Sequence, residues 1–207
     1  AGSFTLSGGA ACNRIAKWTG AAWQQVGTGF NDSVYCLASY QGQLYAGGIF
    51  TAAGATTVSN IARWDGAAWQ PVGAGVSGGS NVRGVFSMLE FAGALHVAGG
   101  FTSVNGSTCA YAARWDGSAW TPMPFPTGSA SNGARALAVF NNELYCGGTV
   151  VVAGGIYLAR WNGSAWVSVL NSAFNTPSAV TSLATFNGNL YIAGTFTRLN
   201  GNAYNRL

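Results

Sequence analysis

Charged residues are scarce in this chain. They make up only 7% of its 207 residues, with nine lysines and arginines against five aspartates and glutamates, whereas ordinary soluble domains have about 25%. Disordered chains are polar and charged, but 49% of these residues are hydrophobic, so the chain can bury a core. The net charge of +4 comes from a shortage of acids and not from a basic cluster, so nucleic-acid binding is not expected.

Long apolar runs and a signal peptide are also missing. No stretch approaches the ~18 apolar residues of a membrane-spanning helix, so no membrane span is expected. Without a signal peptide, the chain is expected to be cytosolic, already processed, or an excerpt of a longer protein. Little lysine and glutamate beside 31 glycines and eight tryptophans is typical of a secreted β protein, which favours an extracellular or cell-surface location.

What the chain does contain is an internal repeat. One seven-residue motif occurs four times, as KWTGAAW (17–23), RWDGAAW (63–69), RWDGSAW (114–120) and RWNGSAW (160–166), and it holds all eight tryptophans. The first tryptophans of the four copies are residues 18, 64, 115 and 161, which gives spacings of 46, 51 and 46. Self-similarity at such a period indicates a repeat architecture.

Two more signatures alternate with the tryptophan motif. One signature begins with leucine, and its four copies are LYAGGIFTAAG, LHVAGGFTSVNG, LYCGGTVVVAGG and LYIAGTFTRLNG. Another signature lies just before each of these copies, and it reads VYCLASY, VFSMLEF, ARALAVF and VTSLATF in the four repeats. Each repeat therefore contains four short apolar runs separated by Gly, Asn and Asp, a pattern typical of strands and hairpin turns and not of helices. Four antiparallel strands per repeat predict an all-β fold, a β-propeller of four-stranded blades.

The two ends of the chain belong to the same repeat unit. Residues 1–15 align with residues 193–207 without a gap, and eight of the fifteen are identical. The strands near 11–26 are therefore expected to complete those near 179–197, which closes a four-bladed single domain over 1–207. The other repeats lie near 33–73, 82–124 and 134–170. If the ends pair between chains instead, head-to-tail self-association follows.

The repeat LYAGGxFTxAGG…NIARWDGxxWxxVG resembles the Kelch-like β-propeller repeats of secreted bacterial proteins and of fungal cortical marker proteins. The similarity covers the whole chain, although such proteins usually have more than four repeats. The resemblance implies display outside the cell or on its surface, and recognition of a partner. Because a propeller fold hosts many functions, the resemblance by itself implies no activity.

Catalytic and metal-binding motifs are mostly absent from the sequence. His96 is the single histidine and stands where the other repeats have tyrosine, so it is expected to be a packing residue. Metal sites need clustered ligands, and no G-x-S-x-G motif is present, so no metal, cofactor or catalytic residue is predicted. One enzymatic alternative stays open: Glu90 and Glu143, from different blades, acting as the paired carboxylates of a carbohydrate-active enzyme.

The cysteines are expected to be buried thiols, because equivalent positions in different blades are farther apart than the ~7 Å between Cα atoms that a disulfide allows. They are Cys12, Cys36, Cys109 and Cys146. Three glycosylation sequons also fall in predicted turns or loops, at Asn31, Asn105 and Asn162.

The best candidate site is a position that varies between repeats within a constant scaffold. Divergent loops on a constant scaffold usually carry recognition. The first predicted strand of each repeat has a small residue as its third residue, and the varying position lies four residues before it. This position holds Asp32, Arg83, Asn132 and Ser178 in the four repeats. Together with Arg135 these residues form the predicted ligand site, and the expected partner at this loop face is a protein or a glycan. The sequence therefore predicts a non-enzymatic extracellular recognition module, with a structural repeat of a larger assembly as the alternative.

Overall fold

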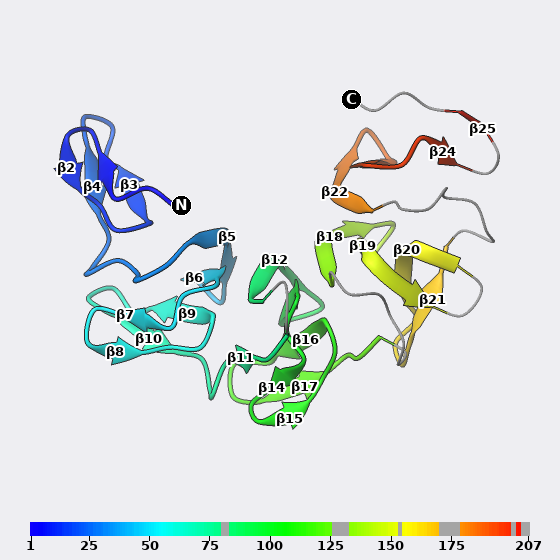
Figure 1. Ribbon diagram of the computed structural model, residues 1–207, viewed down its shortest axis with the longest axis horizontal. Coiled ribbons are helices and arrows are strands. Elements are labelled where there is room, and N and C mark those ends of the chain that lie inside the picture. The colour runs from blue at the N-terminus through cyan, green and yellow to red at the C-terminus, as the bar shows by residue number, and fades with distance from the viewer. Residues whose placement is uncertain (80–82, 126–132, 153–154, 170–178, 200–201, 204–207) are drawn as a thin grey trace.

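The computed structural model describes the chain except for residues 80–82, 126–132, 153–154, 170–178, 200–201 and 204–207. Every regular element in the described part is a β-strand, and no helix occurs there. The sheets follow one another along an open arc, with β1–β4 at one end and β22–β25 at the other (Figure 1). The all-β prediction is therefore confirmed.

Three four-stranded antiparallel sheets form the middle of the arc, and each follows one sequence repeat. The first sheet has β5 (Val34–Tyr40), β6 (Gln43–Gly48), β9 (Ile61–Trp64) and β10 (Trp69–Pro71). The second has β12 (Val85–Phe91), β13 (Ala94–Gly99), β16 (Ala112–Trp115) and β17 (Trp120–Pro122). The third has β18 (Ala134–Phe140), β19 (Glu143–Val152), β20 (Gly155–Trp161) and β21 (Trp166–Ser168). In each sheet the strands lie side by side in the order in which they occur along the chain.

The turn inside the tryptophan motif explains the W-D-G sequence of its second and third copies. In the first sheet the Asp65 carboxylate accepts hydrogen bonds at 2.8 Å from the backbone N–H groups of Ala67 and Ala68. Gly66 takes a φ of 105°, which a side chain would disfavour. The turn thereby sets Trp64 opposite Trp69 in register, with ring centroids 5.3 Å apart. Asp116 and Asn162 accept the same backbone bonds in the other two sheets.

Two half-sheets occupy the two ends of the arc. One is β3 (Ala16–Trp18) with β4 (Trp23–Gln25), and the other is β22 (Val180–Phe186) with β23 (Asn189–Gly194). Among the described strands β3 pairs only with β4, and β23 pairs only with β22. The expected closure within the chain is therefore not formed, because the three complete sheets between the half-sheets hold them at opposite ends of the arc (Figure 1).

Short strands complete the inventory of described strands, and all of them except β11 form hairpins at the place in the repeat between its second and third strands. They are β1 (Leu6–Ser7) with β2 (Ala10–Ala11), β7 (Ala52–Ala53) with β8 (Thr56–Thr57), β11 (Val76–Ser77) with β14 (Ser103–Val104) and β15 (Ser107–Thr108), and β24 (Arg198–Leu199) with β25 (Asn202–Ala203). The first and last hairpins occupy equivalent positions in the repeat, as the alignment of residues 1–15 with 193–207 predicts.

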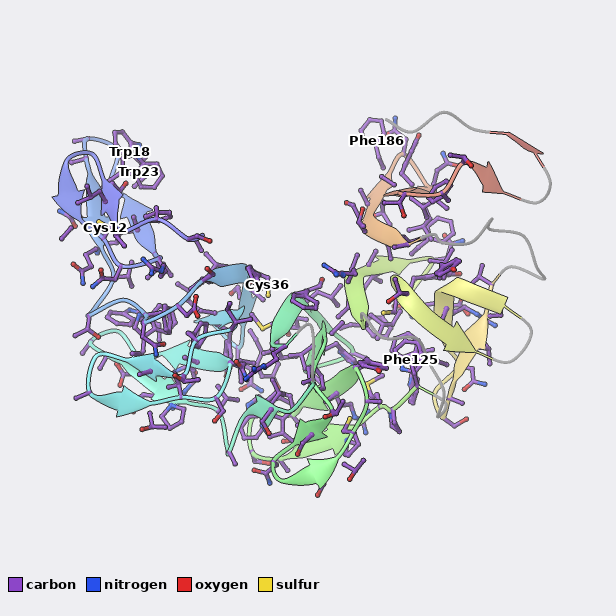
Figure 2. All side chains as sticks on the ribbon, viewed as in Figure 1. Cys12, Trp18, Trp23, Cys36, Phe125 and Phe186 are labelled. Atoms are coloured by element: carbon purple, nitrogen blue, oxygen red, sulfur yellow. The ribbon has the colours of Figure 1, made fainter. Side chains whose placement is uncertain are left out.

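The core lies between successive sheets, where the second tryptophan of the motif bridges them in the three complete sheets. The indole N–H of Trp69 donates to the carbonyl of Val26, and that of Trp166 donates to the carbonyl of Met123. Both rings are buried. Trp115 is buried as well, while Trp64, Trp120 and Trp161 are half-buried and Trp18 and Trp23, at one end of the arc, are exposed (Figure 2).

All four cysteines are free. Cys12, Cys109 and Cys146 are buried, and Cys36 is half-buried. The expectation of unbridged thiols is confirmed, with the lesser burial of Cys36 as the one departure.

Candidate functional site

A cavity of about 780 Å³ lies at the junction of the first and second sheets. Its walls come from Asp32 and the start of β5, from residues 49–60 between β6 and β9, and from Ser77, Gly78, Arg83 and the start of β12. The lining residues are Asp32, Tyr35, Ile49, Thr51, Thr57, Val58, Ser59, Asn60, Ser77, Gly78, Arg83 and Phe86. The cavity thus joins the variable loops of two successive repeats.

Asp32 and Arg83 bring opposite charges to this cavity. Both side chains are exposed, and one Asp32 carboxylate oxygen accepts a hydrogen bond of 2.7 Å from the N–H of Ser33. The second carboxylate oxygen and the Arg83 guanidinium are available to a ligand, since no ion pair between the two residues is formed. A polar ligand can therefore meet an acceptor and a cationic donor in one cavity.

Asn60 forms part of the wall in a fixed orientation. Its side-chain N–H donates a hydrogen bond of 2.7 Å to the carbonyl of Val76, which ties the wall to β11. The residue itself has a left-handed φ of 62°, a conformation that asparagine tolerates better than most residues. The wall is therefore built before any ligand arrives.

A row of equivalent side chains runs beside the cavity along the first strands of the three complete sheets. Tyr35, Phe86 and Arg135 each stand second in their strand. The Tyr35 and Phe86 ring centroids are 5.6 Å apart, and the Arg135 guanidinium carbon lies 5.0 Å from the Phe86 ring centroid. Because Tyr35 remains 49% exposed, the row presents an aromatic surface that ends in a cation.

Three of the five predicted ligand residues can be placed. Asp32 and Arg83 line the cavity together, and Arg135 adjoins it through Phe86. Asn132 and Ser178 lie outside the described residues. Sequence reasoning missed Tyr35 and Phe86, although a signal existed, because this position of the first strand changes from Tyr to Phe, Arg and Thr along the repeats.

The predicted packing histidine is buried. The His96 ring is 5% exposed, and its Nδ1 lies 3.2 Å from the carbonyl oxygen of Ala94. Burial lowers the pKa of His96 to about 4, and the nearby positive charge of Arg114 acts in the same direction. Within the described residues, no group of three or more His, Cys, Asp or Glu side chains is arranged to hold a metal ion.

The two glutamates of the enzymatic alternative have different surroundings. Glu143 forms an ion pair with Arg160 and accepts a hydrogen bond of 3.1 Å from the Tyr145 hydroxyl. Glu90 is exposed on β12, opposite Leu95 on β13. Neither glutamate lines the cavity. The ion pair leaves Glu143 engaged in a contact within its own sheet.

Comparison with known proteins supports the fold and gives no family. No protein-family model matches the chain, and no curated protein matches it in sequence. Among solved structures, the chain is similar to the extracellular domain of a protein from B. thetaiotaomicron described as a hybrid two-component system, with a TM-score of 0.57 and 16% identity. The match covers 89% of this chain and 24% of the other, so the chain spans about a quarter of that structure. No helix in the described residues is long and apolar enough to cross a membrane.

Proposed function

We propose that this chain is a non-enzymatic recognition module that acts outside the cell or on its surface. The cavity between the first and second sheets carries the proposal, because it gathers charged, polar and aromatic side chains from variable positions of a constant scaffold. The four-stranded sheets are proposed to be blades of a Kelch-like β-propeller. The similarity to an extracellular domain supports the proposed location.

The chemistry of the cavity indicates what it would bind. Tyr35 and Phe86 offer ring faces to an apolar group, and Arg83 offers a donor to a carboxylate or hydroxyl group. Asp32 offers an acceptor to a hydroxyl or amide group. A protein loop or a glycan carries such a combination of apolar and polar groups, and one of these is the proposed partner.

The test is a screen of the chain on arrays of glycans and of secreted proteins, followed by affinity measurement for each ligand found. The double variant Arg83→Ala/Arg135→Ala is expected to weaken binding at least tenfold without unfolding the chain. Arg114→Ala is the matched control, since Arg114 is also exposed and lies outside the cavity lining. Equal affinity in the double variant and the control would exclude the cavity as the site.

The absence of catalysis is tested separately with the two glutamates. Hydrolysis of any array glycan, lost in both Glu90→Gln and Glu143→Gln, would establish the carbohydrate-active alternative and overturn the non-enzymatic part of the proposal.

A structural role in a larger assembly is the second candidate function. The observation that favours it is that Trp69, Trp120 and Trp166 each tie their sheet to the preceding one through the same hydrogen bond. Units that hold to their neighbours in this way are typical of extended repeat proteins.

A further inference from the structure

One cluster of three side chains recurs on the same face of each complete sheet. It combines the first and third residues of the second strand with an arginine of the third strand. The third residue lies directly opposite the arginine, in the pairs Tyr45↔Arg63, His96↔Arg114 and Tyr145↔Arg160. Because alternate residues of a strand and directly opposed residues share one face of a sheet, the three side chains of each cluster lie together.

In the third sheet a carboxylate completes the cluster. Glu143, the first residue of β19, forms an ion pair with Arg160 and accepts a hydrogen bond of 3.1 Å from the Tyr145 hydroxyl. In the first sheet an amide has the same role, because the side-chain oxygen of Gln43 accepts a hydrogen bond of 3.1 Å from the Arg63 guanidinium. The first residue of the second strand therefore supplies the acceptor for the arginine in both sheets.

The second sheet has the arginine but lacks this acceptor. The equivalent first residue of β13 is Ala94, whose side chain ends at Cβ. Arg114 is exposed, and within the described part of the chain its guanidinium forms no ion pair and no hydrogen bond. The imidazole of His96 is directed to its own strand, where Nδ1 donates to the carbonyl oxygen of Ala94 at 3.2 Å. The second cluster thus holds a cation whose equivalents are paired in the other two sheets.

Two acids of the second sheet do not take the place of the acceptor. Hydrogen bonds from the turn backbone lower the pKa of Asp116, and the positive charge of Arg114 acts in the same direction. One Asp116 oxygen already accepts from the N–H groups of its turn, and no ion pair with Arg114 is formed among the described residues. Glu90 lies opposite Leu95, which places it on the other face of the sheet. The guanidinium is therefore open to a group from outside the chain.

The first sheet shows that the fold leaves room at this place. A cavity of about 100 Å³ lies beside Tyr45 and Arg63 and is bounded by Trp115 and Gly117 of the next sheet. The second sheet carries an alanine and a histidine where the first sheet has a glutamine and a tyrosine. These smaller side chains leave space beside Arg114 for a group of a few atoms.

We propose that Arg114 and the space beside Ala94 form a binding site for a carboxylate group that comes from outside the chain. The carboxylate takes the place that Glu143 fills in the third sheet and accepts charge-assisted hydrogen bonds from the guanidinium. Its source is a free organic acid or the acidic side chain of a peptide segment.

This site is separate from the cavity described above. Ala94 follows the turn between β12 and β13, whereas Phe86 of the cavity stands at the opposite end of β12. The proposal therefore goes beyond the recognition role proposed for the cavity and does not depend on it.

Acetate is the matched probe, because Ala94 and an acetate ion together contain the side-chain atoms of glutamate. The NMR signal of the Arg114 Nε–H group is followed at pH 7 while sodium acetate replaces sodium chloride at constant ionic strength. A saturable shift is expected, several-fold larger than the shifts of Arg63 and Arg160, since these two arginines already have acceptors. Equal shifts at all three arginines would overturn the proposal.

The variant Ala94→Glu fills the acceptor position from within the chain, as Glu143 does in the third sheet. It should abolish the acetate-dependent shift of the Arg114 signal, and a shift that persists in this variant would overturn the proposal. Ala67→Glu is the matched control, because it adds the same charge to an exposed turn of the first sheet and should leave the shift intact.

The variant Glu143→Ala makes the converse change and does not depend on the folding of Ala94→Glu. It removes the acceptor from the third sheet, so the Arg160 signal should respond to acetate as the Arg114 signal does in the wild-type chain. An Arg160 signal that stays insensitive to acetate would show that a missing acceptor does not create a carboxylate site, and it would overturn the proposal.

The source of the carboxylate is distinguished with two peptides that have neutral ends, Gly-Glu-Gly and Gly-Gln-Gly. A shift of the Arg114 signal with acetate and with Gly-Glu-Gly supports a site for acidic side chains. A shift with acetate and with neither peptide supports a site for free organic acids. Equal shifts with both peptides would overturn the proposal, because the site would then not discriminate a carboxylate from an amide.

Discussion

The indole N–H of Trp69 lies 3.0 Å from the carbonyl oxygen of Val26, which is 43 residues earlier and belongs to the preceding sheet. The same bond joins Trp120 to Val72 and Trp166 to Met123. Each of these three motifs therefore holds its own sheet to the one before it, and the chain stays together through contacts between neighbours, as in other repeat proteins.

Removal of one such contact is expected to be costly. Trp69→Ala should lower the free energy of unfolding by about 3–5 kcal/mol, because a buried ring leaves a cavity. Trp69→Phe keeps most of the apolar contact but leaves the carbonyl of Val26 unpaired, which costs about 1–3 kcal/mol. Denaturant titration measures both. The control is Trp23→Ala, expected to change stability by less than about 1 kcal/mol in the monomeric chain, because Trp23 is exposed.

His96 makes stability depend on pH. Its pKa is lowered by burial to about 4, while the unfolded chain has the ordinary value near 6.5. The unfolded state therefore binds more protons between these values, and stability is lost as the pH falls from 6.5 to 4. The loss is about 3 kcal/mol when complete.

His96→Tyr is the matched variant, because Tyr45 and Tyr145 occupy the equivalent positions of the first and third sheets. Unfolding titrations at pH 7 and pH 4.5 should show a smaller loss of stability in the variant than in the wild-type chain. The lowered pKa values of Asp65 and Asp116 contribute acid sensitivity to both proteins and cancel in this comparison. Parallel pH profiles would show that His96 does not titrate as expected.

The strands were predictable because local chemistry repeats along the chain. The turn of Asp65 and Gly66 depends on residues within the motif itself, and so do the strands that flank it. The cavity was only partly predictable, because Tyr35 and Phe86 become neighbours through the packing of β5 against β12. The openness of the arc was not predicted, since curvature depends on how closely successive sheets approach, and that distance depends on pairs of residues that lie in different repeats.

The thiols of the native chain are expected to be slow to react. Burial raises the pKa of Cys36 to about 12, and it raises the pKa of Cys146 as well. Because the thiolate is the nucleophile, both should resist a disulfide reagent at pH 8 until the chain unfolds, when all four cysteines react. Absorbance of the released thiol measures this. A Lys17→Cys variant supplies an exposed thiol as a positive control, and rapid native reaction of Cys36 would contradict the prediction.

Close approach of the sheets is expected to depend on matched pairs of small residues. A Cβ on Gly47 would lie 2.7 Å from a methyl carbon of Val85 in the next sheet. At the junction of the second and third sheets, Ala98 stands in the position of Gly47 and Ala134 stands in the position of Val85. The larger residue on one side is thus matched by a smaller residue on the other. Gly47→Ala alone should therefore cost about 1–3 kcal/mol, because the added methyl overpacks the junction.

The double variant Gly47→Ala/Val85→Ala places two alanines at this junction, as Ala98 and Ala134 occupy the junction of the second and third sheets. It should be more stable than the sum of the two single variants predicts, by about 1 kcal/mol or more, because the methyl added at one position fills the space left at the other. Gly147→Ala combined with Val85→Ala is the control. Gly147 meets Val180 and not Val85, so these two changes should add. Additivity in both double variants would mean that the sheets shift to accommodate the methyl group, and that the curvature of the arc is set elsewhere.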